Sequence, residues 1–502
     1  MIYMRQRVSV ILVFILFLFL LMVNLVQPCL GSSHYKKMVV NKDDLDINQS
    51  VSDSSISTDW TVLYYICEGM GPYIDPLLEN LSRIGSKDQL NIVALVDRPG
   101  PDNSSIIFIN STGTKISLNE QLGWPNEVET NDSKTFEEFC INLITEFPAN
   151  HYAVITYASG GTGWQRYNLD DSKGKGLSTP EFAQSLERIT HEINHKIDVL
   201  FTSCCMSSIE LCYGIEPYVN YLVSTQEHIT GYRLIQRYYL AIEDLAHNTS
   251  LHPQEFAQRA AENHVPQECY YWESYGKKIL PIAEKLDQLP FEKVHTVKIK
   301  TSVAVINLSR IENVITSVNN LSVYFLHSLE EDDEIRDILK CSRENTRMFG
   351  KVSTKHTLMN ILYSFYPFNT FLADKSHPVN QAIINMSWMT IGRLYQHLPL
   401  ELFAYDCRLD LYDLTDQIDS RTQNSTLKQL CKNVQNNIND TVITIKKIND
   451  DPSHGINIYF PGRKITYNKF VGGGVVPSPY EALRFSKDTN WDDFLHSYLH
   501  IS

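Results

Sequence analysis

The sequence predicts an α/β protein built on a doubly wound, mainly parallel β-sheet with helices on both faces. Three observations lead to this class. The composition is globular, with 43% hydrophobic and 20% charged residues. Short apolar runs recur through the first half of the chain, as in strands that are buried on both faces of a parallel sheet. Segments with helical periodicity alternate with these runs, which is typical of right-handed βαβ units.

The apolar runs predict five strands, each four to six residues long and rich in Val, Ile, Leu, Tyr or Phe. They cover Thr61–Ile66, Asn91–Val96, Tyr152–Tyr157, Ile197–Phe201 and Tyr221–Ser224. Helices are expected between them, over Pro76–Ile84, Thr135–Phe147 and Thr179–Ile193. The last has the clearest start, because Ser178 or Thr179 can cap it and Pro180 suits a first helical position.

The second half predicts an α+β region with less regular spacing. Strands are expected over Ser302–Leu308, Val442–Ile448 and Ile456–Phe460, the last two around a turn at Asp450–Gly455. Helices are expected over Ile311–Leu326, Leu409–Ile418 and Leu427–Ile438. We therefore expect a flexible polar linker over 32–58, an α/β domain over 59–290 and an α+β region over 291–502.

Charge and cysteine content exclude several classes. The 502 residues carry a formal net charge of −14, which disfavours nucleic-acid binding because phosphates need a basic surface. Ten cysteines are too few for a disulfide-dominated scaffold. No His, Cys, Asp or Glu spacing resembles a zinc site, so we expect no metal and no cofactor. The oligomeric state stays open.

The N-terminus predicts export. Arg5 and Arg7 precede an apolar run over 8–26, and small residues mark a plausible cleavage site after Gly31. Residues 1–31 fit a cleaved signal peptide or an uncleaved single-pass membrane anchor, since the run is close to the ~20 residues that span a bilayer. Either way the rest lies outside the cell or at its surface. Glycosylation sequons agree with export, at Asn48, Asn80, Asn103, Asn110, Asn131, Asn248, Asn307, Asn320, Asn385, Asn424 and Asn439.

Two segments at predicted strand ends bear the chemistry. The third strand runs into a segment with three glycines, 160, 161 and 163, which permit close backbone approach to a ligand. The fourth strand ends before Cys204, just ahead of a predicted helix whose dipole favours a thiolate. The position suits a nucleophile. The alternative is that Cys204 and Cys205 are buried hydrophobic side chains or an oxidised pair.

Several motifs in sequence order carry a family resemblance. They are Trp60–Tyr65, Val96–Arg98, Gly163–Trp164, Cys204 with Met206 and Glu210, Val223–Glu227, Asp410–Leu414, Gly455–Pro461 and Trp491–Leu495. With them the chain resembles the clostripain-like cysteine peptidases, which share the caspase-type fold. The resemblance runs from Trp60 nearly to the C-terminus.

The resemblance implies a Cys–His dyad of which this chain keeps one member. Cys204 matches the nucleophile. The family's His precedes the glycines in a His-Gly-x-Gly-Trp-like pattern, and counting back from Trp164 puts it on Gly160. The family's Asp two residues before the Cys, associated with a preference for basic substrate side chains, is Thr202 here. Gly161, Gly163 and Asp97 are further expected cleft residues, with a strand-end cap as the alternative for Asp97.

Two functions follow as hypotheses. The first is an exported peptidase homologue that is catalytically impaired and binds peptides or protein partners at the former active-site cleft. The alternative is an active cysteine endopeptidase in which another base serves Cys204. His228 is the candidate, because it follows the fifth strand, whereas His151, His191 and His195 precede strands and belong to the opposite edge.

Overall fold

The computed structural model describes most of the chain from Thr58 onward, within one compact unit, Ser57–Ser502. The described residues are 58–67, 71–157, 160–161, 163–164, 167–168, 176–202, 206–226, 231–264, 268–270, 298–300, 302–331, 333–349, 408–462, 464, 467 and 479–501.

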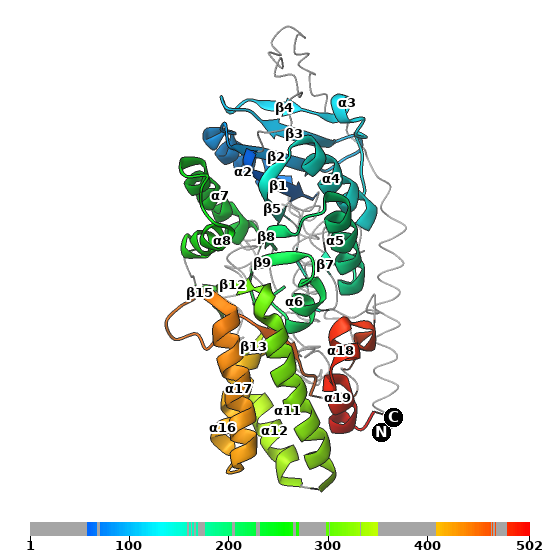
Figure 1. Ribbon diagram of the computed structural model, residues 1–502, viewed down its shortest axis with the longest axis vertical. Coiled ribbons are helices and arrows are strands. Elements are labelled where there is room, and N and C mark those ends of the chain that lie inside the picture. Colours follow the sequence, from blue (N-terminus) through cyan, green and yellow to red (C-terminus); the bar gives the residue numbers. More distant parts are fainter. Residues whose placement is uncertain are drawn as a thin grey trace, which may run out of the picture. The chain divides into compact units, whose positions relative to one another are not determined.

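A nine-stranded sheet forms the centre of this unit, in the order β15-β12-β9-β8-β5-β1-β2-β3-β4 (Figure 1). The five middle strands run parallel and correspond to the five predicted apolar runs. This confirms the doubly wound, mainly parallel α/β class. The middle strands are β1 (Thr58–Ile66), β2 (Leu90–Asp97), β5 (Ala149–Tyr157), β8 (Ile197–Phe201) and β9 (Val219–Ser224).

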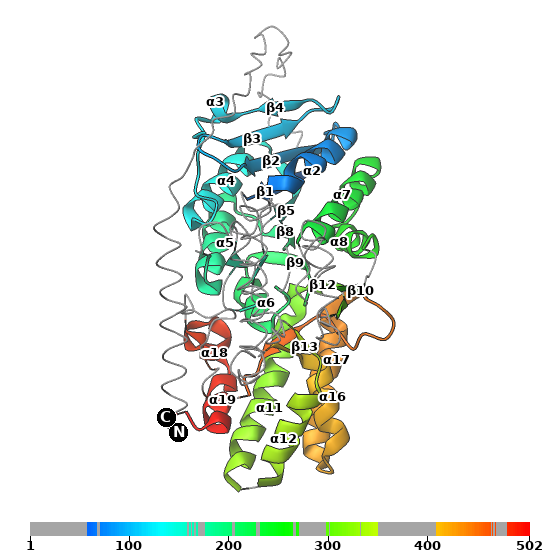
Figure 2. The same ribbon diagram turned by 180° about the vertical axis from the view of Figure 1, so that it is seen from behind.

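Helices cover both faces of the sheet, and each face has its own hydrophobic core (Figures 1 and 2). On one face pack α4 (Ser133–Glu146), α5 (Thr179–Ile193) and α6 (Ile209–Ile215). On the other pack α2 (Gly71–Ile84), α7 (Gly231–His247) and α8 (Pro253–Glu262). Burial on both sides explains why the middle strands read as continuous apolar runs.

The cap of α5 forms as predicted. The Ser178 hydroxyl accepts a hydrogen bond from the Glu181 amide, and the Glu181 carboxylate accepts one from the Ser178 amide. This reciprocal pairing satisfies two of the amides that a helix start leaves without partners. The helix therefore begins at Thr179 and ends at Ile193, where Asn194 adopts a left-handed conformation.

The sheet also has an antiparallel edge that the sequence does not predict. Strands β3 (Ser104–Ile109) and β4 (Lys115–Ser117) extend it beyond β2, and the short helix α3 (Asn119–Leu122) follows. Side chains in β3 alternate between buried and half-buried, and those of β4 are mainly exposed. Such short edge strands lack the continuous apolar signal of the middle strands.

The C-terminal region contributes directly to the same sheet. Strand β12 (Val303–Asn307) pairs antiparallel with β9, and β15 (Val442–Lys446) pairs with β12. The sheet therefore crosses the boundary expected near residue 290. The two strands expected around Asp450–Gly455 both exist, but they do not pair with each other. β16 (Asn457–Tyr459) lies instead in a three-stranded sheet with β13 (Met348–Phe349) and β14 (Arg408–Asp410).

The helices of the C-terminal region pack against one another (Figure 1). They are α11 (Ile311–Glu331), α12 (Asp333–Asn345), α16 (Leu411–Arg421), α17 (Ser425–Thr441), α18 (Arg484–Asp488) and α19 (Trp491–Leu499). The short elements that complete the description are β6 (Gly160–Gly161), β7 (Tyr167–Asn168), β10 (Glu268–Tyr270), β11 (Lys298–Lys300), η3 (Leu308–Arg310) and η6 (Tyr480–Ala482).

The expectations for residues 1–31, and for all but the last residue of the linker, fall outside the described residues. Strand β1 begins at Thr58, three residues before the predicted Thr61. Across the part of the chain that the structure describes, no helix combines the length and the apolar character needed to cross a membrane.

Gly455 sits where β12 and β15 meet and offers a test of this junction. Its φ is +98°, and a Cβ atom there would lie 2.9 Å from Val442 Cγ1 and 3.0 Å from Ala304 Cβ. Gly123 has a φ of +62° but nothing within 4 Å. Both glycine-to-alanine changes incur the ~1–2 kcal/mol of a left-handed L-residue. Only Gly455→Ala adds an overpacking cost, of about 1–3 kcal/mol.

We therefore expect Gly455→Ala to lower the free energy of unfolding more than Gly123→Ala does. Denaturant titration of both variants and the unchanged protein measures the difference. Equal losses would show that the junction has room for a methyl group.

Candidate functional site

The carboxyl ends of β5, β8 and β9 lead into the region of the expected site. Gly160 comes shortly after β5, Thr202 directly follows β8, and Gln226 follows β9 after one residue. Because these strands are parallel neighbours, their ends meet at one edge of the sheet. The expected cleft positions that are described therefore share one edge.

Thr202 is fully buried and held by β9. Its amide donates to the Val223 carbonyl over 3.1 Å, and its hydroxyl donates to Ser224 Oγ over 2.8 Å. A neutral pair of hydroxyls thus lies directly after the carboxyl end of β8.

The glycine segment adopts extended backbone. Gly160 and Gly161 form β6 and pair with Asn168 and Tyr167 of β7. The Tyr167 hydroxyl contacts Thr156 Oγ1 near the end of β5, so β7 is fastened to the main sheet. Gly163 has a φ of +66°, a left-handed conformation that glycine adopts without strain.

Asp97 is buried, with 2% of its surface exposed. One carboxylate oxygen accepts from Ser104 Oγ at 2.7 Å, and the other accepts from Thr130 Oγ1 at 3.0 Å. These bonds join the end of β2 to β3 and to the loop before α4. They favour the strand-end cap over direct contact with a ligand.

The reactive candidates Cys204 and His228 lie outside the described residues, as does Cys205. Cys212 is buried on α6, as expected for a core residue, and burial raises its pKa strongly. His151 stands near the start of β5 and His195 precedes β8, so both belong to the amino-terminal edge of the sheet, as the sequence predicts.

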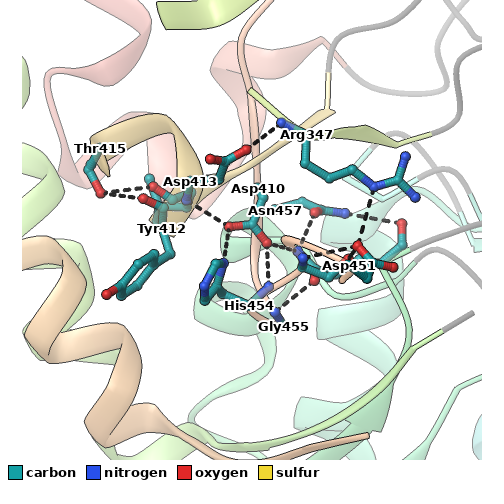
Figure 3. A network of polar contacts seen from close by, with 12 residues as sticks. Arg347, Asp410, Tyr412, Asp413, Thr415, Asp451, His454, Gly455 and Asn457 are labelled. Carbon is teal, nitrogen blue, oxygen red and sulfur yellow. Dashed lines mark hydrogen bonds and ion pairs between the residues drawn. The ribbon is translucent and has the colours of Figure 1, made fainter. Parts of the chain in front are cut away.

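A buried polar network beside the carboxyl edge was missed in the sequence. It surrounds Asp410, which is fully buried between β14 and α16 (Figure 3). The Asp410 carboxylate accepts four hydrogen bonds: from the Asp413 amide (2.9 Å), the His454 amide (2.6 Å), His454 Nδ1 (3.1 Å) and Gln226 Nε2 (2.9 Å). The sequence identifies Asp410 only as part of a family motif and indicates no role for its side chain.

His454 lies at the carboxyl edge of the sheet, although the sequence does not indicate a histidine from the C-terminal region there. Its ring stacks on Tyr412 with centroids 4.0 Å apart, and its side chain is 29% exposed. The neighbouring Gly455 amide donates to Gln226 Oε1 over 2.7 Å. His454 is thus brought beside the end of β9 from more than two hundred residues away in the sequence, a placement that only tertiary contacts reveal.

A second buried contact joins the C-terminal region to the glycine segment. Trp164 packs edge-on against Tyr459 and Tyr480, each with centroids 4.9 Å away. Glu210 of α6 accepts from the Tyr459 amide over 2.8 Å and from the Tyr480 hydroxyl over 2.9 Å. Burial raises the pKa of the Glu210 carboxyl, although these hydrogen bonds oppose the shift.

No group of three or more His, Cys, Asp or Glu side chains that could hold a metal ion occurs within the described ranges. The geometry at this edge therefore offers backbone amides, neutral hydroxyls and buried carboxylates that are bonded within the protein.

Comparison with known proteins defines the class. The sequence profile of the clostripain family (peptidase family C11) matches residues 74–498. The chain therefore belongs to the clostripain family. A search of curated proteins finds no match.

Solved structures of C11 proteases are similar at low identity. An inactive zymogen C11 protease from Parabacteroides distasonis is 12% identical, with 86% of this chain and 99% of that chain covered and a TM-score of 0.49. A secreted C11 cysteine protease from Bacteroides thetaiotaomicron, in complex with an irreversible peptide inhibitor, is 14% identical, with 81% and 93% covered and a TM-score of 0.46.

The buried Glu210 predicts a pH dependence of stability. Its raised pKa means that the folded protein holds this proton more tightly than the unfolded chain does. As the pH rises from the ordinary glutamate pKa toward the raised one, the unfolded chain ionises first and the folded state loses stability, by ~1.4 kcal/mol per pH unit. Glu210→Gln removes this loss.

Thermal unfolding from pH 4 upward compares the unchanged protein with Glu210→Gln. The exposed Glu120→Gln is the control for removing one carboxylate. We expect the melting temperature of Glu210→Gln to fall less as the pH rises. Parallel curves for all three proteins would contradict the assignment.

Proposed function

We propose that this chain is an exported, catalytically impaired member of the clostripain family that binds peptides or protein segments at the carboxyl edge of its sheet. The observation that carries the proposal is Gly160. It lies in β6 just past the end of β5, at the position where the family pattern has its histidine. A glycine has no side chain that transfers a proton.

Loss of the imidazole weakens both halves of the reaction. A thiol with a pKa of ~8.5 is only a few per cent thiolate at pH 7 without a neighbouring base. The leaving amine also lacks its proton donor. General acid–base catalysis contributes ~10²–10⁴-fold, so Cys204 alone supports slow turnover at most. Binding of an extended peptide needs neither group.

Thr202 supports a ligand preference that differs from that of relatives with an aspartate there. Its hydroxyl and that of Ser224 form an uncharged pair next to the segment bearing Cys204. An Arg or Lys side chain of a peptide gains no ion pair from such a pair. We therefore propose neutral side chains as the preferred ligands at this subsite.

We propose export because the N-terminus is basic and then apolar. An exported chain can carry glycans on sequon asparagines that are exposed. Two sequon residues, Asn131 and Asn307, are buried, and Asn307 uses its side chain to cap the turn at Ser309. The sequons exposed among the described residues are Asn103, Asn248, Asn320, Asn424 and Asn439. We propose these five as the glycan acceptors.

Peptide binding without turnover tests the proposal. A panel of fluorogenic and fluorescently labelled peptides is offered to the full chain without its leader, and binding and cleavage are measured in parallel. We expect saturable binding and turnover at least ~10²-fold below that of an active family member. Turnover that Cys204→Ser abolishes would overturn the proposal and favour the active peptidase with a relocated base such as His228.

Ligand preference is tested at position 202. Thr202→Asp places a carboxylate where the family has one, so peptides with Arg or Lys should gain affinity by about tenfold relative to neutral peptides. Thr202→Asn matches the size without the charge and should not change the ratio. A ratio that moves equally in both variants, measured by fluorescence anisotropy, would show that residue 202 does not contact the ligand side chain.

A further inference from the structure

The segment that carries Cys204 is fastened at both ends. At one end, Thr202 is bonded to Val223 and Ser224 of β9. At the other, the Ser207 amide donates to the Thr225 carbonyl over 3.2 Å, and the Ser207 carbonyl accepts from the Asn457 amide over 2.7 Å. Thr202 is thus held by the end of β9, and Ser207 by Thr225 and by β16 of the C-terminal region.

Gln226 links these two supports. It is fully buried, and its Nε2 donates both to Asp410 Oδ2 (2.9 Å) and to Asn457 Oδ1 (2.7 Å). Its Oε1 accepts from the Gly455 amide over 2.7 Å. Both donor hydrogens and the acceptor of this amide are therefore used, each by the C-terminal region.

Asn457 completes the link in the reverse direction. Its Nδ2 donates to the Gln226 carbonyl over 3.2 Å, while its backbone amide holds Ser207. Asn457 is fully buried, so a displaced side-chain donor or acceptor could not bond to water instead and would lower the stability of the fold. The position of Asn457 therefore follows that of Gln226.

Strand β16 also contacts the glycine segment, on the other side of the expected cleft. Tyr459, two residues after Asn457, packs on Trp164, which closes the glycine segment after β5. Its carbonyl accepts from Trp491 Nε1 over 2.9 Å, which fastens β16 to α19. One short strand thus contacts residues on both segments that border the expected cleft.

We propose that Gln226 and Asn457 are positioning residues that hold Ser207, three residues after Cys204 in the sequence, so that the C-terminal region controls ligand binding at the expected cleft. This inference rests on the proposed function. It assigns the C-terminal region a part in the site, because Asn457 bonds Ser207 directly, and Asp410 and Gly455 hold the Gln226 side chain that bonds Asn457. Hydrogen bonds inside a buried network are fixed in direction, so a change at Gln226 shifts the segment that the network holds.

Two variants test the proposal with little change in volume. Gln226→Glu replaces the donor to Asp410 and Asn457 with an oxygen. Asn457→Asp keeps an acceptor for Gln226, replaces the donor to the Gln226 carbonyl with an oxygen and adds a buried acidic group. The control is Glu137→Gln, a buried position bonded to Ser185 and Arg188 between α4 and α5.

Three quantities are measured on each folded variant: the melting temperature, the dissociation constant of a labelled peptide, and the rate at which iodoacetamide alkylates Cys204, followed by mass spectrometry. We expect both network variants to weaken peptide binding, Gln226→Glu by about tenfold, and to change the alkylation rate by about threefold or more. Glu137→Gln should lower the melting temperature and leave the other two quantities within about twofold.

The outcomes separate this inference from the proposed function. If the unchanged protein binds no peptide, the proposed function fails, but the alkylation rates still decide whether Gln226 and Asn457 orient the Cys204 segment. If the network variants lose thermal stability while alkylation and peptide affinity follow those of Glu137→Gln, the network is only structural and the inference is wrong. Asn457→Asp provides the answer if Gln226→Glu does not fold.

Discussion

The buried carboxylate of Asp410 is the constraint on which the arrangement at the carboxyl edge depends. A carboxylate without water must be surrounded by donors, because leaving it unpaired is costly. Its four donors come from the first turn of its own helix, from the turn before β16 and from Gln226, two residues after the end of β9. Meeting this requirement brings together segments that are up to 228 residues apart, since His454 and Gln226 share the same carboxylate.

This requirement explains why the C-terminal region and the central sheet form one compact unit. Strands β12 and β15 extend the sheet. The Asp410 network bonds the C-terminal region to Gln226, just beyond the end of β9. Gly455 lies between these two features, and its backbone conformation and lack of a side chain allow the chain to pass close to Val442 and Ala304. Residues from both halves of the described chain therefore support the expected cleft.

Function at this edge can then be understood as a balance of retained and replaced chemistry. Under the proposed function, Gly160 and Thr202 stand where the family resemblance implies a proton-transferring side chain and an acidic side chain. The buried groups that remain, Asp97, Asp410 and Glu210, are bonded to neighbours inside the protein. These bonds stabilise the carboxyl edge of the sheet.

The sequence by itself determined the class of fold, because strands covered on both faces need continuous apolar residues, and runs such as Ile197–Phe201 show this directly. It also determined the start of α5, since capping is a local interaction of Ser178 and Glu181. Only the tertiary structure decided the places of β3 and β4, whose exposure pattern is weak, and of β16, which pairs away from β15. The same holds for Gln226, His454 and Asn457, because buried polar residues have no periodicity and acquire their partners only when distant segments meet.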